Sequence, residues 1–238
     1  MKSMFSRVVL PLVLASIGVG RSAQAQSAGY AVSPYDPASP GSDWYTTESL
    51  DLRGKLRPQA GLLVDWAYAP LVLDGANGAR VRVLTDQVNV HARSSLVIAN
   101  RYRFGIDSPQ TLYAHGDARE SPRYEQAPGD LRLDADARLF GTYWRPFRGA
   151  AGRELFAPMG RRDLYTSDGT FRIMPRVLLA GDAKAFAWAA KLGFHYRPFE
   201  GTWAGRDLGS QLTFAVSAGV QVNDRFVIGP ELHGAATM

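Results

Sequence analysis

Seven charged or titratable side chains recur at alternate positions in two segments, and they are the first candidates for chemistry. They are Arg132, Asp134, Asp136 and Arg138 in one segment and Lys191, His195 and Arg197 in the other. Asp134 and Asp136 have the residue type of a general acid–base carboxylate pair. Because arginines flank both carboxylates in the same phase, we favour a ladder of salt bridges over catalysis.

Other catalytic patterns are missing from the sequence. It contains no Gly-x-Ser-x-Gly, no phosphate-binding glycine loop and no His-Glu-x-x-His. It has no cysteine, and its four histidines lack partners at the spacing of a metal site: His91, His115, His195 and His233. We therefore expect neither enzyme activity, nor a cofactor, nor a metal site.

The candidate residues lie in segments that alternate with the period of a β-strand. From Leu131 to Leu139 apolar and charged residues alternate strictly. On a helix the apolar residues of this segment would form two rows about 200° apart, which leaves no apolar face. Similar alternation occurs at Phe186–Arg197 and Leu212–Val220, and more weakly at Leu62–Tyr68, Val88–Ala99, Tyr102–Ile106, Phe171–Leu179 and Phe226–Leu232.

Turn signals between these segments predict an antiparallel meander. Tight reversals are predicted at Asn77-Gly78, Asn100-Arg101, Gly181-Asp182 and Asn223-Asp224. Longer polar connections are predicted at Gln110–Gly129, Gly160–Gly169 and Phe199–Gly209, whereas the stretch from Thr142 to Gly152 is ambiguous. The predicted fold is all-β, an antiparallel up-and-down barrel with about nine visible strands.

The residues of the two faces indicate which solvent each face meets. The apolar phase is rich in large side chains, and the opposite phase mixes small residues with long charged ones, as a packed polar lumen requires. The strands have about 9 to 13 residues, the length of a tilted membrane crossing. Aromatic residues collect near strand ends, as in an interfacial girdle, although ordinary core packing explains any single cluster: Trp66 and Tyr68, Tyr143 and Trp144, and Tyr196, Phe199 and Trp203. We predict a transmembrane barrel whose lumen is lined by the seven residues.

The N-terminus has the order of a secretory signal peptide. Lys2 and Arg7 precede a 13-residue apolar run, Val8–Gly20, and Ala23-Gln24-Ala25 has the form of a cleavage site. A run of 13 is too short for a membrane helix, which needs about 20 residues. The predicted domains are therefore a signal peptide (1–25), an irregular periplasmic lead-in (26–56) and the β-barrel (57–238).

Several short motifs, taken in order, resemble a known family. They are Glu48–Gly54, Arg57–Gly61, Asp65–Leu73, Asp86–His91, Gly129–Leu133, Met174–Arg176 and Gly209–Phe214. Over most of the chain from Asp43 onward, this series resembles the barrels of OmpA-related proteins of Gram-negative outer membranes. The resemblance implies a transmembrane barrel, often followed by a periplasmic peptidoglycan-binding domain.

The chain departs from that family pattern in two ways. It stops at Met238 without such a domain or a C-terminal aromatic residue. The nine strands are an odd number, whereas bacterial single-chain barrels close with an even number. We therefore expect either an overlooked strand or an incomplete, truncated barrel of 10–12 strands.

The predicted function is an exported outer-membrane barrel with a charged lumen, either a structural envelope component or a porin-like channel for small solutes. Outer-membrane lipid is the expected partner, and Arg161-Arg162 would contact lipopolysaccharide phosphates. The net charge of +5 is spread along the strands, which argues against nucleic acid. The oligomeric state stays open. A soluble periplasmic barrel that binds an apolar ligand is the alternative, and a barrel-embedded hydrolase ranks last.

Overall fold

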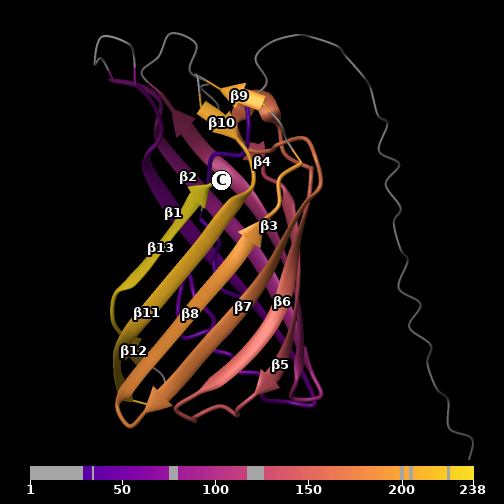
Figure 1. Cartoon of the computed structure of the whole chain (residues 1–238), viewed down its shortest axis with the longest axis vertical. Helices are drawn as coiled ribbons and strands as arrows, with labels where there is room; N and C mark the ends of the chain where they lie inside the picture. The colour runs from indigo at the N-terminus through magenta and orange to yellow at the C-terminus, as the bar shows by residue number, and fades with distance from the viewer. Residues whose placement is uncertain are drawn as a thin grey trace, which may run out of the picture.

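The protein is one antiparallel sheet of nine ordered strands that curls through 305° into an open half-barrel (Figure 1). This computed structural model describes residues 29–33, 35–74, 80–116, 126–198, 201–203, 206–223 and 226–238. The predicted signal peptide and the Asn77-Gly78 turn lie outside the described residues. The prediction of an all-β, up-and-down antiparallel fold is confirmed.

The long strands follow one another in the sheet in chain order. They are β1 (Leu56–Asp74), β2 (Arg80–Ile98), β3 (Tyr102–His115), β5 (Leu131–Phe140), β6 (Arg148–Ala157), β7 (Arg172–Ala183), β8 (Phe186–His195), β11 (Gln211–Asn223) and β13 (Glu231–Thr237). Short elements complete the fold: β4 (Ala127–Pro128) on β3, β12 (Phe226–Ile228) on β11, a separate hairpin of β9 (Gly201–Trp203) and β10 (Arg206–Leu208), and the 3-10 turn η1 (Arg162–Leu164). No helix in the described part of the chain is long and apolar enough to span a membrane.

The sheet is open because its first and last strands have only one partner each. β1 pairs with β2 over almost its whole length, and β13 pairs with β11. In the described residues no pairing joins β1 to β13. Since each strand runs opposite to its neighbour and there are nine, β1 and β13 run parallel to one another on either side of the opening.

Alternation along the strands sends large apolar side chains outward and charged or small ones inward. Phe214 on β11 is 42% exposed, whereas the next residue, Ala215, is 0% exposed. On β5, Leu133 is 42% exposed and Asp134 only 8%. Because successive side chains of a strand point to opposite faces, the sheet has an apolar outer surface and a charged inner one.

The two ends of the half-barrel differ in their connections (Figure 1). Long connections, with β9 and β10, gather at the upper end of Figure 1, and short reversals lie at the lower end. Ala99 and Asn100 both have a φ of 54°, the left-handed conformation of a tight hairpin turn, close to the predicted reversal.

The predicted reversal at Gly181-Asp182 is wrong, because both residues lie within β7 and the chain turns at Lys184 and Ala185. Gly181 has a packing role instead: a Cβ there would meet the carbonyl of Pro146 and the indole nitrogen of Trp188. The backbone N–H of Asp182 donates to the Arg145 carbonyl at 3.0 Å.

Two strands are clearer in the structure than in the sequence. The ambiguous stretch from Thr142 to Gly152 contains the start of β6, which pairs with both β5 and β7. β3 continues past Ile106, where alternation ends, to His115. Pro109 lies where β3 changes partner, between its pairing with β5, which stops at Asp107, and its pairing with β4, which begins at Gln110. The carbonyl of Pro109 accepts from the N–H of Gly129 at 2.9 Å.

Candidate functional site in the interior of the half-barrel

The interior is occupied by residues 29–33 and 35–54, called the N-terminal segment below. This segment has no strand, yet Thr47, Ser49, Leu50 and Leu52 are each at most 1% exposed. Its contacts reach strands from β3 to β13, as described below. The irregular N-terminal segment therefore occupies the space that the curled sheet encloses.

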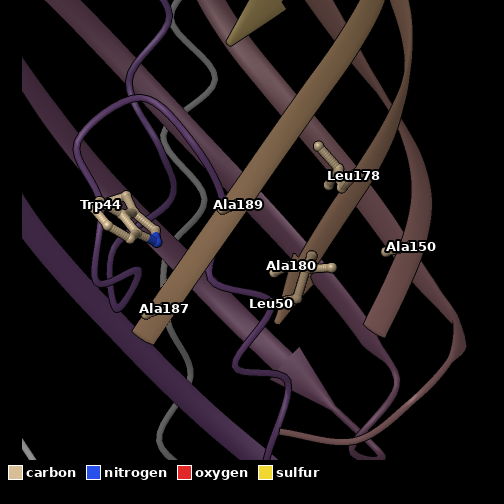
Figure 2. Close-up of a cluster of buried hydrophobic side chains, with 7 residues drawn as sticks. All are labelled: Trp44, Leu50, Ala150, Leu178, Ala180, Ala187 and Ala189. Carbon is tan, nitrogen blue, oxygen red and sulfur yellow. The ribbon is translucent and has the colours of Figure 1, made fainter. Parts of the chain in front are cut away.

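Apolar contacts anchor this segment near the end of the half-barrel that carries the short turns. Trp44 and Leu50 pack against inner-face side chains of three strands (Figure 2). These are Ala150 of β6, Leu178 and Ala180 of β7, and Ala187 and Ala189 of β8. Four of the five are alanines, so the strands leave room for the indole ring inside the sheet.

A chain of ion pairs links the N-terminal segment to the middle of the sheet. Nη1 of Arg103 on β3 donates to Oε2 of Glu48 at 2.6 Å, and Nη2 donates to Oδ2 of Asp136 on β5 at 2.5 Å. Asp136 also accepts from Nε and Nη2 of Arg176 on β7, both at 2.9 Å. Arg176 further pairs with Glu154 of β6. All of these groups are buried, which makes paired charges necessary.

Asp36 of the N-terminal segment forms a second link. Its Oδ2 accepts from Nζ of Lys191 on β8 at 2.7 Å, and its Oδ1 lies 3.4 Å from Nη1 of Arg132 on β5. Burial by itself raises the pKa of Asp36, but the positive charges of Lys191 and Arg132 outweigh burial and hold that pKa well below its usual value. Asp36 is therefore an anion that bridges two strands.

Further polar contacts hold the same segment to β13, the last strand, and to β6 in the middle of the sheet. Glu231 of β13 accepts from the backbone N–H groups of Tyr45 and Thr46 at 2.7 and 2.8 Å. Nε of Arg148 on β6 donates to the carbonyl of Ser49 at 2.7 Å, and the same side chain pairs with Asp182 of β7. The segment thus connects strands that do not pair with one another.

A third cluster lies toward the end with the long connections. Asp168 accepts from Nε and Nη2 of Arg197 at 2.8 and 2.6 Å and from the N–H of Ala31 at 2.8 Å. Arg172 donates to Asp130 at 2.6 Å. Burial acts to raise the pKa of Asp168, but the hydrogen bonds from Arg197 and the charge of Arg172 lower the pKa below its usual value.

The seven residues singled out in the sequence are found on the inward phase of their segments. Five of the seven are buried, and the other two, Arg132 and Arg138, are half-buried. The five are Asp134, Asp136, Lys191, His195 and Arg197. Five of the seven take part in the clusters above or in the cavity described next, and Asp134 joins the same network because its Oδ2 lies 3.6 Å from Nη2 of Arg176. Arg138 does not, and the described residues give its side chain no ion pair.

Sequence reasoning missed most of the buried inner charges. Glu48 and Asp36 lie in a stretch without periodicity, and Glu154 lies beyond the ambiguous one. A usable signal existed for Arg172 and Arg176, which share one phase of the weakly alternating segment Phe171–Leu179.

The aromatic residues divide between the two faces. Trp66 and Tyr68 of β1 are 65% and 59% exposed on the outer surface, the face on which the girdle is predicted. Tyr143, in the connection between β5 and β6, instead contacts the N-terminal segment: its hydroxyl donates to Oδ2 of Asp43 at 2.9 Å. Burial and the charge of Asp43 raise the pKa of Tyr143. Phe199 and the side chain of Trp203 lie outside the described part of the structure.

A cavity of about 220 Å³ remains between the N-terminal segment and the strands at the end with the long connections. Its wall includes Arg132, Arg172, Arg197 and His195 together with the ring of Phe156. His195 stacks on Phe156, with the ring centroids 4.7 Å apart.

No group of three or more His, Cys, Asp or Glu side chains in the described residues has the arrangement of a metal site. The most closely packed candidate is His91 of β2, which lies between two carboxylates. Its Nδ1 is 2.9 Å from Asp107 and its Nε2 is 3.3 Å from Asp65. The hydrogen bond between His91 and Asp107, whose Oδ2 lies 3.9 Å from Nη1 of Arg132, makes this group part of the same interior network.

Comparison with known protein families and with curated proteins finds no match for this chain. The site is therefore described by its geometry. It is an antiparallel half-barrel with an apolar exterior and many buried salt bridges inside, and the N-terminal segment in its interior joins its strands.

Proposed function

We propose that this chain is a bacterial outer-membrane β-barrel protein and that it acts as a structural component of the envelope. The observation that carries this proposal is the orientation of the sheet, which turns its large apolar side chains outward and its charges inward. Outer-membrane barrels have this distribution, with a lipid-facing apolar band and a polar interior.

A water-soluble barrel would have the opposite distribution, with charged side chains outside and large apolar side chains inside. On the outer face the exposed apolar residues continue around the sheet, for example Val64 on β1, Phe104 on β3, Val177 on β7 and Phe214 on β11. Soluble monomers rarely expose contiguous apolar patches larger than a few hundred Å². The alternative of a soluble periplasmic barrel with an apolar ligand inside has less support, because the interior carries Arg103, Asp136 and many other charges.

Location is tested by expressing the full chain in a Gram-negative host and separating the membranes. We expect the protein in the outer-membrane fraction, resistant to alkaline extraction and released only by detergent. Recovery of folded protein in the soluble periplasmic fraction would overturn the proposal and favour the soluble alternative.

Of the two roles predicted for such a barrel, the structural one has the stronger support. The N-terminal segment and the Glu48–Arg103–Asp136–Arg176 pairs occupy the middle of the interior. Conduction through a pore depends on a continuous path lined by polar groups. We expect folded protein in planar bilayers to show no steady conductance, and stable open channels would refute the structural role.

Outer-membrane lipid is the partner that follows from this proposal. Arg161 lies at the end with the long connections, with its side chain 59% exposed, and pairs with Asp163. Arg162 instead donates to the carbonyl of Gly29 in the N-terminal segment. Lipopolysaccharide contact is therefore proposed for Arg161 alone, and unchanged binding to lipopolysaccharide-containing vesicles after Arg161→Glu would refute it.

A further inference from the structure

The interior cavity of about 220 Å³ is too large to be a packing defect. At about 30 Å³ for each molecule of liquid water, it has room for roughly seven waters or for one small organic molecule. The cavity lies among the ends of several strands, and its wall combines the N-terminal segment with β2, β7, β8 and β11.

Buried polar atoms in this wall lack partners. Nε2 of His195, Nε of Arg172 and Oε1 of Gln87 have no hydrogen bond to any described residue. His195 is 8% exposed and Gln87 1% exposed. Buried polar groups are nearly always hydrogen-bonded, so these three atoms together indicate that something else occupies the cavity.

An incompletely paired cationic donor in the wall, Nε of Arg172, favours an anion as the occupant. Three guanidinium groups line the cavity, those of Arg132, Arg172 and Arg197, together with the carboxylates of Asp36 and Asp130, and Asp168 lies behind the wall within ion-pair distance of Arg172 and Arg197. Asp168 accepts both hydrogen bonds from Arg197, which leaves Nε of Arg172 3.5 Å from its nearest carboxylate oxygen. A ligand oxygen in the cavity would give this donor a partner.

The rest of the wall indicates an apolar body on the same ligand. Phe156, Met174 and Val32 line the cavity beside the arginines. An aromatic or aliphatic acid would place an apolar body beside these side chains, which an inorganic anion lacks.

We propose that this cavity binds a small organic carboxylate, with the carboxylate group at Arg172 and His195 and the apolar body against Phe156 and Met174. This site is independent of the membrane location proposed above, because all of its groups lie inside the sheet. Nε2 of His195 donates one hydrogen bond and Nε of Arg172 donates another, and both would be charge-assisted bonds to the carboxylate.

The test uses benzoate as the probe and benzyl alcohol as its neutral counterpart, with the full chain folded in detergent micelles. Titration calorimetry should show saturable binding of benzoate and much weaker binding of benzyl alcohol. His195→Phe, which keeps the stacking on Phe156, should weaken benzoate binding about tenfold or more, since it removes a hydrogen bond to a charged group. His195→Gln, which keeps an N–H donor, should restore part of the affinity.

Arg138→Gln is the matched control, because Arg138 shares the inward phase of β5 but does not line the cavity. Its benzoate affinity should equal that of the wild type. Equal binding of benzyl alcohol, unchanged affinity in His195→Phe, or no saturable binding of benzoate by the folded wild type would each overturn the proposal. If His195→Phe does not fold, an NMR titration of the wild type with benzoate replaces it. Binding at this site should shift the ring resonances of His195, and unshifted resonances would refute the site.

Discussion

Arg103 and Glu48 are separated by 55 residues in the chain, and they form a buried ion pair with 2.6 Å between Nη1 and Oε2. Their side chains are only 4% and 2% exposed. The pair joins an irregular segment to the third long strand of the sheet, and through Asp136 it joins that strand to the next. Removing one charge from such a pair leaves the other buried and incompletely compensated.

Glu48→Ala should therefore lower the free energy of unfolding by about 3 kcal/mol, the cost of breaking a buried pair. Denaturant unfolding of the full chain in micelles measures it. Asp163→Ala is the control: its partner Arg161 is 59% exposed, and exposed pairs contribute about 1 kcal/mol at most. Equal effects of the two substitutions would contradict a stabilising role for Glu48.

Asp36 and Lys191 should be energetically coupled, because Nζ lies 2.7 Å from Oδ2 inside the sheet. In a double-mutant cycle of Asp36→Asn and Lys191→Met, we expect a coupling energy of about 1–3 kcal/mol. Additive single effects would mean that the N-terminal segment does not depend on this contact.

Leu192→Arg distinguishes lipid from water at the outer face. Leu192 is 51% exposed in the middle of β8, and arginine near the bilayer midplane costs about 2–4 kcal/mol. Phe171→Arg, just before β7, is the control, with an expected cost of about 1 kcal/mol or less near the interface. Folding in lipid vesicles measures both, and a neutral effect of Leu192→Arg would count against a membrane environment.

Gly152→Ala should destabilise the protein, because the inner face at this position has no room for a methyl group. An added Cβ would lie 2.6 Å from the carbonyl oxygen of Ala135 and would also meet the carboxylate of Asp136. Gly61→Ala is the control, since its Cβ would meet only Pro40 at 3.8 Å. We expect a loss of about 1–3 kcal/mol for Gly152→Ala and little change for Gly61→Ala, both measured by thermal unfolding.

Asp51 should contribute an acid-sensitive part of the stability. Burial by itself raises its pKa, but hydrogen bonds from Arg53 and Arg57 outweigh burial and lower the pKa from 3.8 to about 2. A depressed pKa stabilises the fold above pH 3.8, and this contribution is lost as the pH falls toward 2. In that window the unfolding free energy of the wild type should fall more steeply than that of Asp51→Asn; parallel curves would refute the role of Asp51.

The alternation of Leu131–Leu139 was sufficient to predict a strand with Asp134 and Asp136 on one face and leucines on the other. It was not sufficient to identify the partners of these carboxylates. The flanking arginines looked suitable, but Asp136 pairs with Arg103 of β3 and Arg176 of β7. A period of two determines which face a side chain is on, whereas the partner depends on which strands face it across the interior.

Glu48 and Asp36 show what the sequence left undetermined. Their stretch has no periodicity, so nothing in it indicated burial, and its position follows only from the curvature of a sheet that encloses it. The sequence by itself determined most of the strands, their antiparallel order and the division into apolar and charged faces, because these depend on local alternation and turns. Only the tertiary structure decided what fills the interior and which charges pair there, because these depend on contacts between residues as far as 185 positions apart.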